Sequence, residues 1–193
     1  MTPPTVLQRP KSAAATKLAM LDAARSRFLQ ESYENVGLRD IARDVGVDVA
    51  LVSRYFGSKE ELFRQVLGID RKEEILPADL SEAEIPAYLA RLFVQQGEEG
   101  NRHVERLLIM LRSASSPTAA TIVREALRTD VLRPFANRLQ GSDVELRASS
   151  LMAVWMGMTI LRTVMALEPL CGSDIEDRLR HLFEAALGEG ASR

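Results

Sequence analysis

The sequence predicts an all-α protein with a small N-terminal domain and a larger helical body. Apolar residues make up 46% of the chain and charged residues 27%, as in an ordinary folded protein. Alanine and leucine are abundant while runs of β-branched residues are scarce, which favours helices over strands. Apolar residues also recur at intervals of three and four along most of the 193 residues, the spacing of one helix face.

The N-terminus combines prolines with basic side chains, so we interpret residues 1–12 as a flexible basic arm. Such an arm can reach the minor groove of DNA, and an unstructured end without a role explains the composition equally well. A first helix is predicted from Ser12 or Ala13 to about Glu31. Its buried stripe comprises Leu18, Leu21, Ala24, Phe28 and Leu29.

Residues 38–63 contain the most informative local pattern. Apolar residues three and four apart form one stripe on a short helix, which ends at Gly46, where a left-handed residue is needed. Asp48 is a good N-cap for a second short helix, Val49 to Phe56. Two short helices around a glycine-containing turn form a helix-turn-helix, so this stretch is predicted to read DNA.

A third helix is predicted to start after Ser58, which forms a capping box with the glutamate three residues later. It continues as far as Ile75, and Pro77 ends it. This helix joins a helix-turn-helix domain, residues 13–68, to a larger helical domain, residues 69–193.

The charge distribution agrees with contact to DNA through one end. The net charge is -2, yet ten basic and eight acidic residues precede residue 69, whereas 15 basic and 19 acidic residues follow. A mildly basic head on an acidic body fits a protein that brings only its head to a phosphate backbone.

The body is predicted to contain five helices and no strands. Pro134 is expected to kink the third, and the fourth is apolar on nearly all sides, so it has no natural solvent face. We expect the last two helices to pair with their copies as the four-helix bundle of a homodimer; a central helix in a monomer is the alternative. The five span about 81–98, 101–115, 117–139, 143–167 and 173–188.

The composition argues against several other classes of protein. The longest apolar run, Leu151–Leu167, contains Thr159 and Arg162 and is short for a membrane span, so no membrane is expected. The single cysteine, Cys171, and the lack of a signal-peptide pattern favour a reducing, cytoplasmic compartment. We find no phosphate-cradling loop, no catalytic serine motif and no metal-ligand spacing, so neither an enzyme nor a cofactor nor a metal is expected.

At residues 13–67 the chain resembles the TetR family of transcriptional regulators, the tetracycline-repressor-like proteins. The resemblance rests on Gly37-Leu38-Arg39-Asp40-Ile41-Ala42, on Gly46-Val47 and on Tyr55-Phe56-Gly57-Ser58-Lys59-Glu60-Glu61-Leu62. It implies a homodimer that places two recognition helices in double-stranded DNA at a palindromic operator, and a small-molecule effector in the body that releases it. Repression is the family's commoner mode. An activator of the same fold is the alternative, and a helical enzyme or adaptor is a third reading.

The predicted DNA contacts follow from this helix-turn-helix. Arg54 is the best candidate for base readout, because a guanidinium can bond guanine O6 and N7 together; a phosphate contact or a surface salt bridge are the alternatives. By resemblance, Arg39 aligns with a base or phosphate contact, and Tyr55 and Lys59 with phosphate contacts. The recognition face comprises Val49, Ala50, Leu51, Ser53 and Arg54.

The chain also departs from the family pattern. Val36 and Gly37 stand where a threonine or serine is common, which leaves backbone N–H groups to contact phosphate. Ala50, Leu51 and Ser53 also differ from common residues, so no operator sequence can be carried over. We expect Asp40 and Asp44 to offset Arg39 and Arg43 locally.

Candidate effector contacts lie on the body helices, and ordinary core packing is the alternative for each. Arg162 needs a partner on so apolar a helix: Glu168, a carboxylate of the other subunit, or an acidic ligand. The candidates are Phe93, Met110, Trp155, Met156, Thr159 and Arg162.

Overall fold

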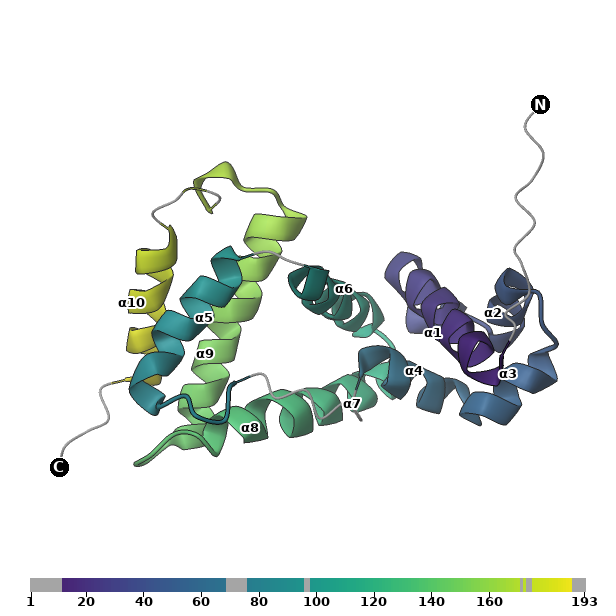
Figure 1. Ribbon diagram of the computed structural model, residues 1–193, viewed down its shortest axis with the longest axis horizontal. Coiled ribbons are helices and arrows are strands. Elements are labelled where there is room, and N and C mark those ends of the chain that lie inside the picture. Colours follow the sequence, from purple (N-terminus) through teal and green to yellow (C-terminus); the bar gives the residue numbers. More distant parts are fainter. Residues whose placement is uncertain (1–11, 69–75, 96–97, 171, 173–174, 189–193) are drawn as a thin grey trace. The chain divides into compact units, whose positions relative to one another are not determined.

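The computed structural model describes residues 12–68, 76–95, 98–170, 172 and 175–188. Every regular element in these ranges is helical, which confirms the predicted all-α class (Figure 1). The chain divides into two compact units: Met1–Arg71 with Leu108–Ala126, and Lys72–Leu107 with Leu127–Arg193. Residues 1–11 of the predicted arm lie outside the described residues. The prediction that the third helix continues to Ile75 is wrong, because Gly68 adopts the left-handed conformation and ends that helix after Leu67.

The first unit contains the helix-turn-helix. α1 begins after Ser12, whose hydroxyl accepts a hydrogen bond from the Ala15 N–H at 3.1 Å. α4 ends at Gly68, which takes the left-handed conformation with φ 71°. The elements are α1 (Ala13–Gln30), η1 (Tyr33–Asn35), α2 (Leu38–Val45), α3 (Val49–Phe56), α4 (Lys59–Leu67), the C-terminal part of α6 (Glu98–Ser113) and α7 (Pro117–Ala126).

Three aromatic rings form the centre of this unit. The Phe63 ring meets Phe28 and Tyr33 edge-on, with centroids 4.9 and 5.0 Å apart. Phe28 and Phe63 are fully buried and Tyr33 is 3% exposed, so α1, η1 and α4 share one core. α1 also contacts α2, and α4 contacts α3, so the helices that form this core support the helix-turn-helix.

Residues from later in the chain also pack on the first unit. Arg112 of α6 donates to the carbonyl of Gln30 at 3.2 Å, and Arg64 of α4 pairs with Glu125 of α7 at 2.8 Å. These contacts explain why Leu108–Ala126 belongs to the same compact unit as the helix-turn-helix, although the sequence pattern assigns it to the body.

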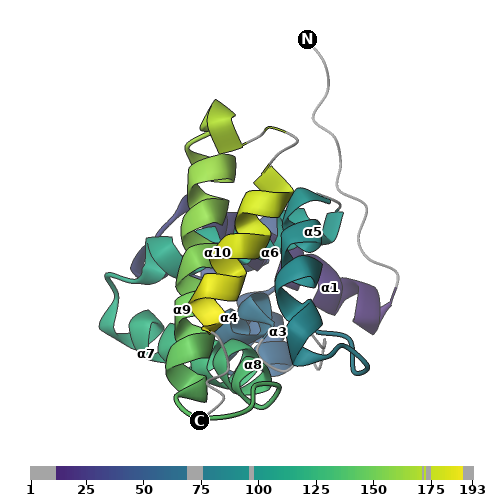
Figure 2. The ribbon, with the colours of Figure 1, turned by 90° about the vertical axis from the view of Figure 1, so that its left-hand side faces the viewer.

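In the second unit, α5 (Ile85–Val94), α9 (Val144–Thr159) and α10 (Ile175–Leu187) lie side by side (Figures 1 and 2). α8 (Arg133–Ala136) packs against α9. The buried side chains that these helices share include Ile85, Leu89, Phe93, Phe135, Ala148, Leu151, Ile175, Leu179, Phe183 and Leu187.

Two predicted long helices are interrupted by wider turns. The predicted helix 117–139 is α7, a π-helical segment Leu127–Leu132 and then α8. Pro134 lies in the first turn of α8, where its missing N–H costs nothing, so the interruption precedes the proline. The predicted helix 143–167 is α9 followed by a π-helical segment, Ile160–Val164.

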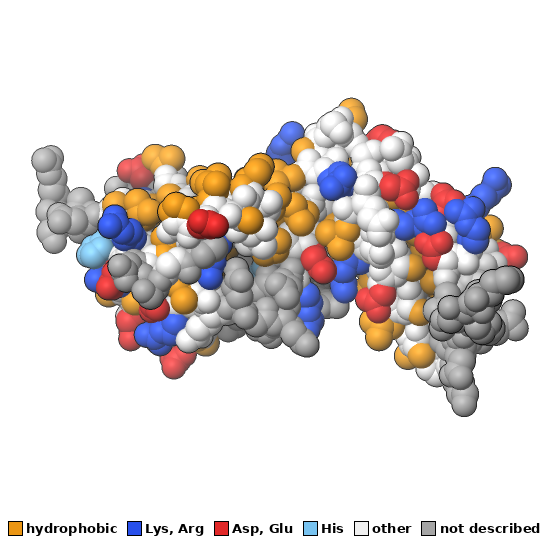
Figure 3. Space-filling view, turned by 90° about the horizontal axis from the view of Figure 1, so that it is seen from above, with side chains coloured by type: hydrophobic (Ala, Val, Ile, Leu, Met, Phe, Trp, Pro, Cys, Tyr) orange, Lys and Arg blue, Asp and Glu red, His pale blue; other side chains and the backbone are white. Residues whose placement is uncertain are grey.

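One described segment, Val144–Val164, is long and apolar enough to cross a membrane by length and composition alone, with mean hydropathy 1.2 and 17% of it buried. Its inner side, with Ala148 and Leu151, belongs to the core of the second unit. Its other side is open to solvent, and Leu146 is 67% exposed. Figure 3 shows hydrophobic side chains gathered on one face of this unit.

Candidate nucleic-acid interface

The turn between α2 and α3 is closed by local hydrogen bonds. Gly46 adopts φ 72°, which lets the Val47 N–H donate back to the Ala42 carbonyl at 2.9 Å. Asp48 then caps α3 by accepting from the Ala50 N–H at 2.7 Å. The angle between the two helices is therefore set by residues that lie within the motif itself.

α3 separates its packing residues from its polar residues. Val52 and Phe56, one turn apart, are 0% and 3% exposed. Ser53 and Arg54 are exposed, and Arg54 makes no ion pair within the described part of the chain, so its guanidinium is available to a base edge. Of the other recognition-face residues, Ala50 is exposed, while Val49, Leu51 and Tyr55 are half-buried.

Arg39 is exposed on the first turn of α2, whereas its neighbours are paired. Arg43 donates to Asp40 at 2.7 Å, as expected from their spacing. Gly37 caps α2 without a side-chain hydrogen bond, and a Cβ there would lie 2.9 Å from the Asp40 carboxylate. A larger residue at this position would require the end of the Asp40 side chain to move, and as the sequence stands backbone N–H groups form the start of the helix.

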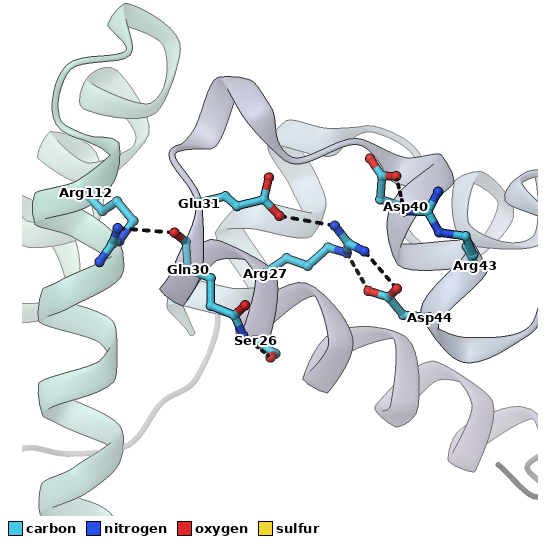
Figure 4. Close-up of polar contacts among 8 residues, drawn as sticks. All are labelled: Ser26, Arg27, Gln30, Glu31, Asp40, Arg43, Asp44 and Arg112. Carbon is cyan, nitrogen blue, oxygen red and sulfur yellow. Dashed lines mark hydrogen bonds and ion pairs between the residues drawn. The ribbon is translucent and has the colours of Figure 1, made fainter. Parts of the chain in front are cut away.

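The direct partner of Asp44 is a residue that the sequence did not indicate. Arg27 of α1 grips both of its carboxylate oxygens, Nη2 to Oδ1 at 2.8 Å, and also reaches Glu31 at 3.2 Å (Figure 4). The hydrogen bonds from Arg27 hold the pKa of Asp44 below its usual value. Arg43 also lowers the pKa of Asp44 through its charge, as expected, but the larger effect comes from Arg27, which tertiary packing brings into direct contact.

Lys59 lies against protein groups of the α1–α2 connection. Its ammonium sits 4.3 Å from the centroid of the Tyr33 ring and 3.4 Å from the Glu34 carbonyl oxygen. Desolvation by these neighbours lowers the pKa of Lys59. The Glu34 carboxylate in turn accepts a hydrogen bond from Ser116, at the start of α7.

Sequence reasoning missed one basic side chain in this region. The Lys17 ammonium lies 5.6 Å from the centroid of the Phe56 ring, beside the last turn of α3. In the sequence, Lys17 is only a lysine in the first turns of a predicted helix. Nothing in the sequence pattern shows that this part of the helix lies beside the recognition helix.

The structure brings together most of the candidate effector residues. The Phe93 ring meets Trp155 edge-on at 5.7 Å, and the Arg162 guanidinium lies 4.9 Å from its centroid. Thr159 is buried and its hydroxyl donates to the Trp155 carbonyl at 2.8 Å, within α9. Met156 is half-buried on the same helix, whereas Met110 belongs to the first unit. Among the described residues, no group of three acidic, histidine or cysteine side chains could hold a metal ion.

Two family models match the chain. One, described as bacterial regulatory proteins, tetR family, covers residues 20–66. The other, described as tetracyclin repressor-like, C-terminal domain, covers residues 83–187, which is more than half of the chain. No curated protein matched.

Several solved structures share the fold at low sequence identity. Salmonella enterica GusR is 14% identical with a TM-score of 0.72, over 93% of this chain and 99% of that chain. NalD of Pseudomonas aeruginosa is 19% identical with a TM-score of 0.64, over 89% and 96%. SmeT, in complex with triclosan, is 23% identical with a TM-score of 0.56, over 90% and 88%.

The helix-turn-helix geometry and the two family matches lead to the same assignment. Regulators of this family bind DNA and small-molecule effectors, act as dimers in the cytoplasm, and are generally not enzymes. The chain belongs to the TetR family of bacterial regulatory proteins and is a ligand-responsive, DNA-binding transcriptional regulator of the tetracycline-repressor type.

Proposed function

We propose that the protein is a repressor that binds a palindromic operator as a homodimer and leaves it when a small molecule binds the second unit. The observation that carries this proposal is the exposure of Ser53 and Arg54 on a recognition helix whose opposite side is buried. NalD is a secondary repressor of a multidrug efflux pump, and SmeT forms a complex with triclosan. Both precedents support repression and effector binding on this fold.

Within the reader, the residues divide by chemistry into two groups. Arg54 and Ser53 can bond base edges, and Val49, Ala50 and Leu51 can meet thymine methyl groups. The second group contacts the phosphate backbone and so fixes the position of the protein along the duplex; it comprises Arg39, Tyr55 and Lys59. For Lys59 this contact competes with its contacts to Tyr33 and Glu34, so DNA binding moves its ammonium outward.

The dimer forms through the outer side of α9 and α10. Leu146 on α9 is 67% exposed and Leu182 on α10 is 46% exposed, while the inner sides of both helices are buried against α5. Two copies can cover this apolar surface by pairing α9 and α10 in a four-helix bundle. A twofold dimer would read the same sequence twice, which gives the operator its palindrome.

The effector contacts the residues around Phe93. Four of the candidates lie in the second unit, on α9 or just beyond it: Trp155, Met156, Thr159 and Arg162. Met110 is buried on α6, in the first unit. A molecule held here would act on the spacing of the two readers in the dimer, which decides whether both fit successive major grooves.

Selection from random duplexes with the purified full chain tests the proposal. We expect enrichment of one palindrome, a 2:1 ratio of chain to duplex, and loss of the complex with at least one member of a metabolite panel. A reporter behind the selected operator should rise when the gene is deleted; a fall would mean activation. Enrichment of no palindrome would overturn the proposal.

A further inference from the structure

Arg162 carries hydrogen-bond donors that the described protein does not use. Its Nη1 donates to the Phe93 carbonyl at 2.9 Å, at the C-terminal end of α5, and this is its one hydrogen bond among the described residues. A guanidinium has five N–H donors, so most of those of Arg162 have no acceptor among the described residues. No described carboxylate, Glu168 included, forms an ion pair with it.

The surroundings of Arg162 are largely apolar. Its side chain is half-buried, with the guanidinium stacked on the Phe93 ring. The same ring meets Trp155, and Trp155 stacks on Phe183 at 6.0 Å, so three aromatic rings line up beside one cation. The Trp155 indole N–H also has no acceptor among the described residues. Donors without acceptors beside aromatic rings favour an anion attached to an apolar body.

The backbone at this point departs from the regular helix. Arg162 lies in the π-helical segment Ile160–Val164, and such segments often occur at functional sites. Its contact with Phe93 puts it on the side of the helix that faces α5. The second copy is proposed to pair through the exposed side chains Leu146 and Leu182, whereas the guanidinium of Arg162 is directed toward α5 by its hydrogen bond to Phe93.

We propose that Arg162, with Phe93 and Trp155, recognises the carboxylate of an organic acid with an apolar or aromatic body, and that effectors of this protein belong to that class. The guanidinium would hold the carboxylate through two N–H groups, while the rings receive the apolar part. The inference rests on the proposed function for its regulatory meaning, but the binding itself does not depend on DNA.

The single tryptophan of the chain is Trp155, so its fluorescence reports binding at the site itself. We would titrate the full-length protein with butyrate, phenylpropanoate and naphthylacetate, and with the three corresponding neutral amides. At least one acid is expected to give a saturable change in Trp155 fluorescence. The protein should bind this acid about tenfold more tightly than the corresponding amide. Arg162→Gln should lose this preference, whereas Arg162→Lys, which keeps the charge, should retain part of it.

Arg91→Gln is the matched control, because Arg91 is an exposed arginine on α5 whose side chain forms no hydrogen bond or ion pair within the described part of the chain. Its titration curves should match the wild type, and melting curves verify that all variants fold. Equal affinity for acid and amide, no response to any acid, or unchanged binding in Arg162→Gln would overturn the inference. So would a weaker dimer in Arg162→Gln with unchanged acid binding, which would indicate pairing across the dimer.

The two proposals can fail separately. If the palindrome is found but only neutral molecules release it, the acid inference is wrong and the repressor stands. If acids bind but no palindrome is enriched, the operator proposal is wrong and the acid site stands.

Discussion

At the scale of single residues, Asp44 links the helix-turn-helix to α1. Arg27 grips its carboxylate, and this hydrogen bonding lowers the pKa of Asp44. Its stabilisation is therefore complete above the pKa of an unfolded aspartate, about 3.9, and is lost as the pH falls through the lower value of the folded protein. The sequence could not predict this pair, because the two residues are 17 positions apart and meet only after α1 and α2 pack.

Asp44→Asn should lower the free energy of unfolding at pH 7 by about 1 kcal/mol, because the pair is bidentate but the carboxylate is partly exposed. Urea unfolding at pH 7 and at about pH 3 checks this, and the difference between variant and wild type should shrink at the lower pH. Asp22→Asn removes a more exposed pair with Arg25 and should change stability by less than about 0.5 kcal/mol. Equal losses in both variants at both pH values would contradict the assignment.

Arg54→Ala should weaken operator binding by about 1–3 kcal/mol and relax the preference at one base pair. Lys59→Met should instead weaken all sequences alike and reduce the salt slope by about 0.9 per subunit. Binding titrations at several salt concentrations, with the operator and with single-base variants, separate the two effects. Unchanged preference in Arg54→Ala would place this side chain away from the bases.

At the scale of elements, most boundaries set by local caps were predicted closely from the sequence, whereas those set by packing were not. The exception is Gly68, a local cap that ends α4 and that the sequence analysis passed over. α2 and α3 begin and end where Gly46, Asp48 and Gly57 indicate, because each signal acts on its own turn. The π-helical segments 127–132 and 160–164 left no such signal, since their residues fit an α-helical period equally well. The recognition residues could be predicted because the caps locate α3 in the sequence. The neighbours of Arg162 could not be predicted, because they are distant in sequence and meet only in the folded protein.

Arg147 joins several elements of the second unit. It bonds Glu82 and the Gln140 carbonyl, each at 2.6 Å, and also the Leu187 carbonyl at the end of α10. Its side chain is 14% exposed, so these acceptors depend on it. Arg147 thus connects the 3-10 turn Glu82–Glu84 that precedes α5, the loop before α9 and the end of α10.

Arg147→Met should destabilise the second unit by about 2–3 kcal/mol, because it leaves half-buried acceptors unpaired. Trp155 fluorescence during denaturant unfolding reports on this unit. Arg180→Met is the control: Arg180 bonds Asp177 and Glu184 on the surface of α10 and should cost less than about 0.5 kcal/mol. Similar losses in both variants would argue against the role of Arg147.

At the scale of the whole molecule, the outward side of α9 and α10 decides the oligomeric state. Leu182→Glu replaces a side chain that is 46% exposed, so the fold of one chain should survive. A charge buried in a four-helix bundle is costly, so the dimer should dissociate at concentrations where the wild type stays paired. Sedimentation measures this directly, and operator affinity should fall with it. If the Leu182→Glu dimer were as stable as that of the wild type, this surface would not be the dimer interface.

The packing of Leu108–Ala126 on the reader has a consequence for making hybrid regulators. Arg112 and Glu125 lie in a segment that follows the reader by about forty residues, yet they contact α1 and α4. A chimera that transplants only residues 12–68 onto a relative would sever these contacts and uncover the surface of α4 beneath α7. The unit that must be transferred to move DNA specificity is therefore discontinuous in sequence. A chimera should include both residues 12–68 and Leu108–Ala126.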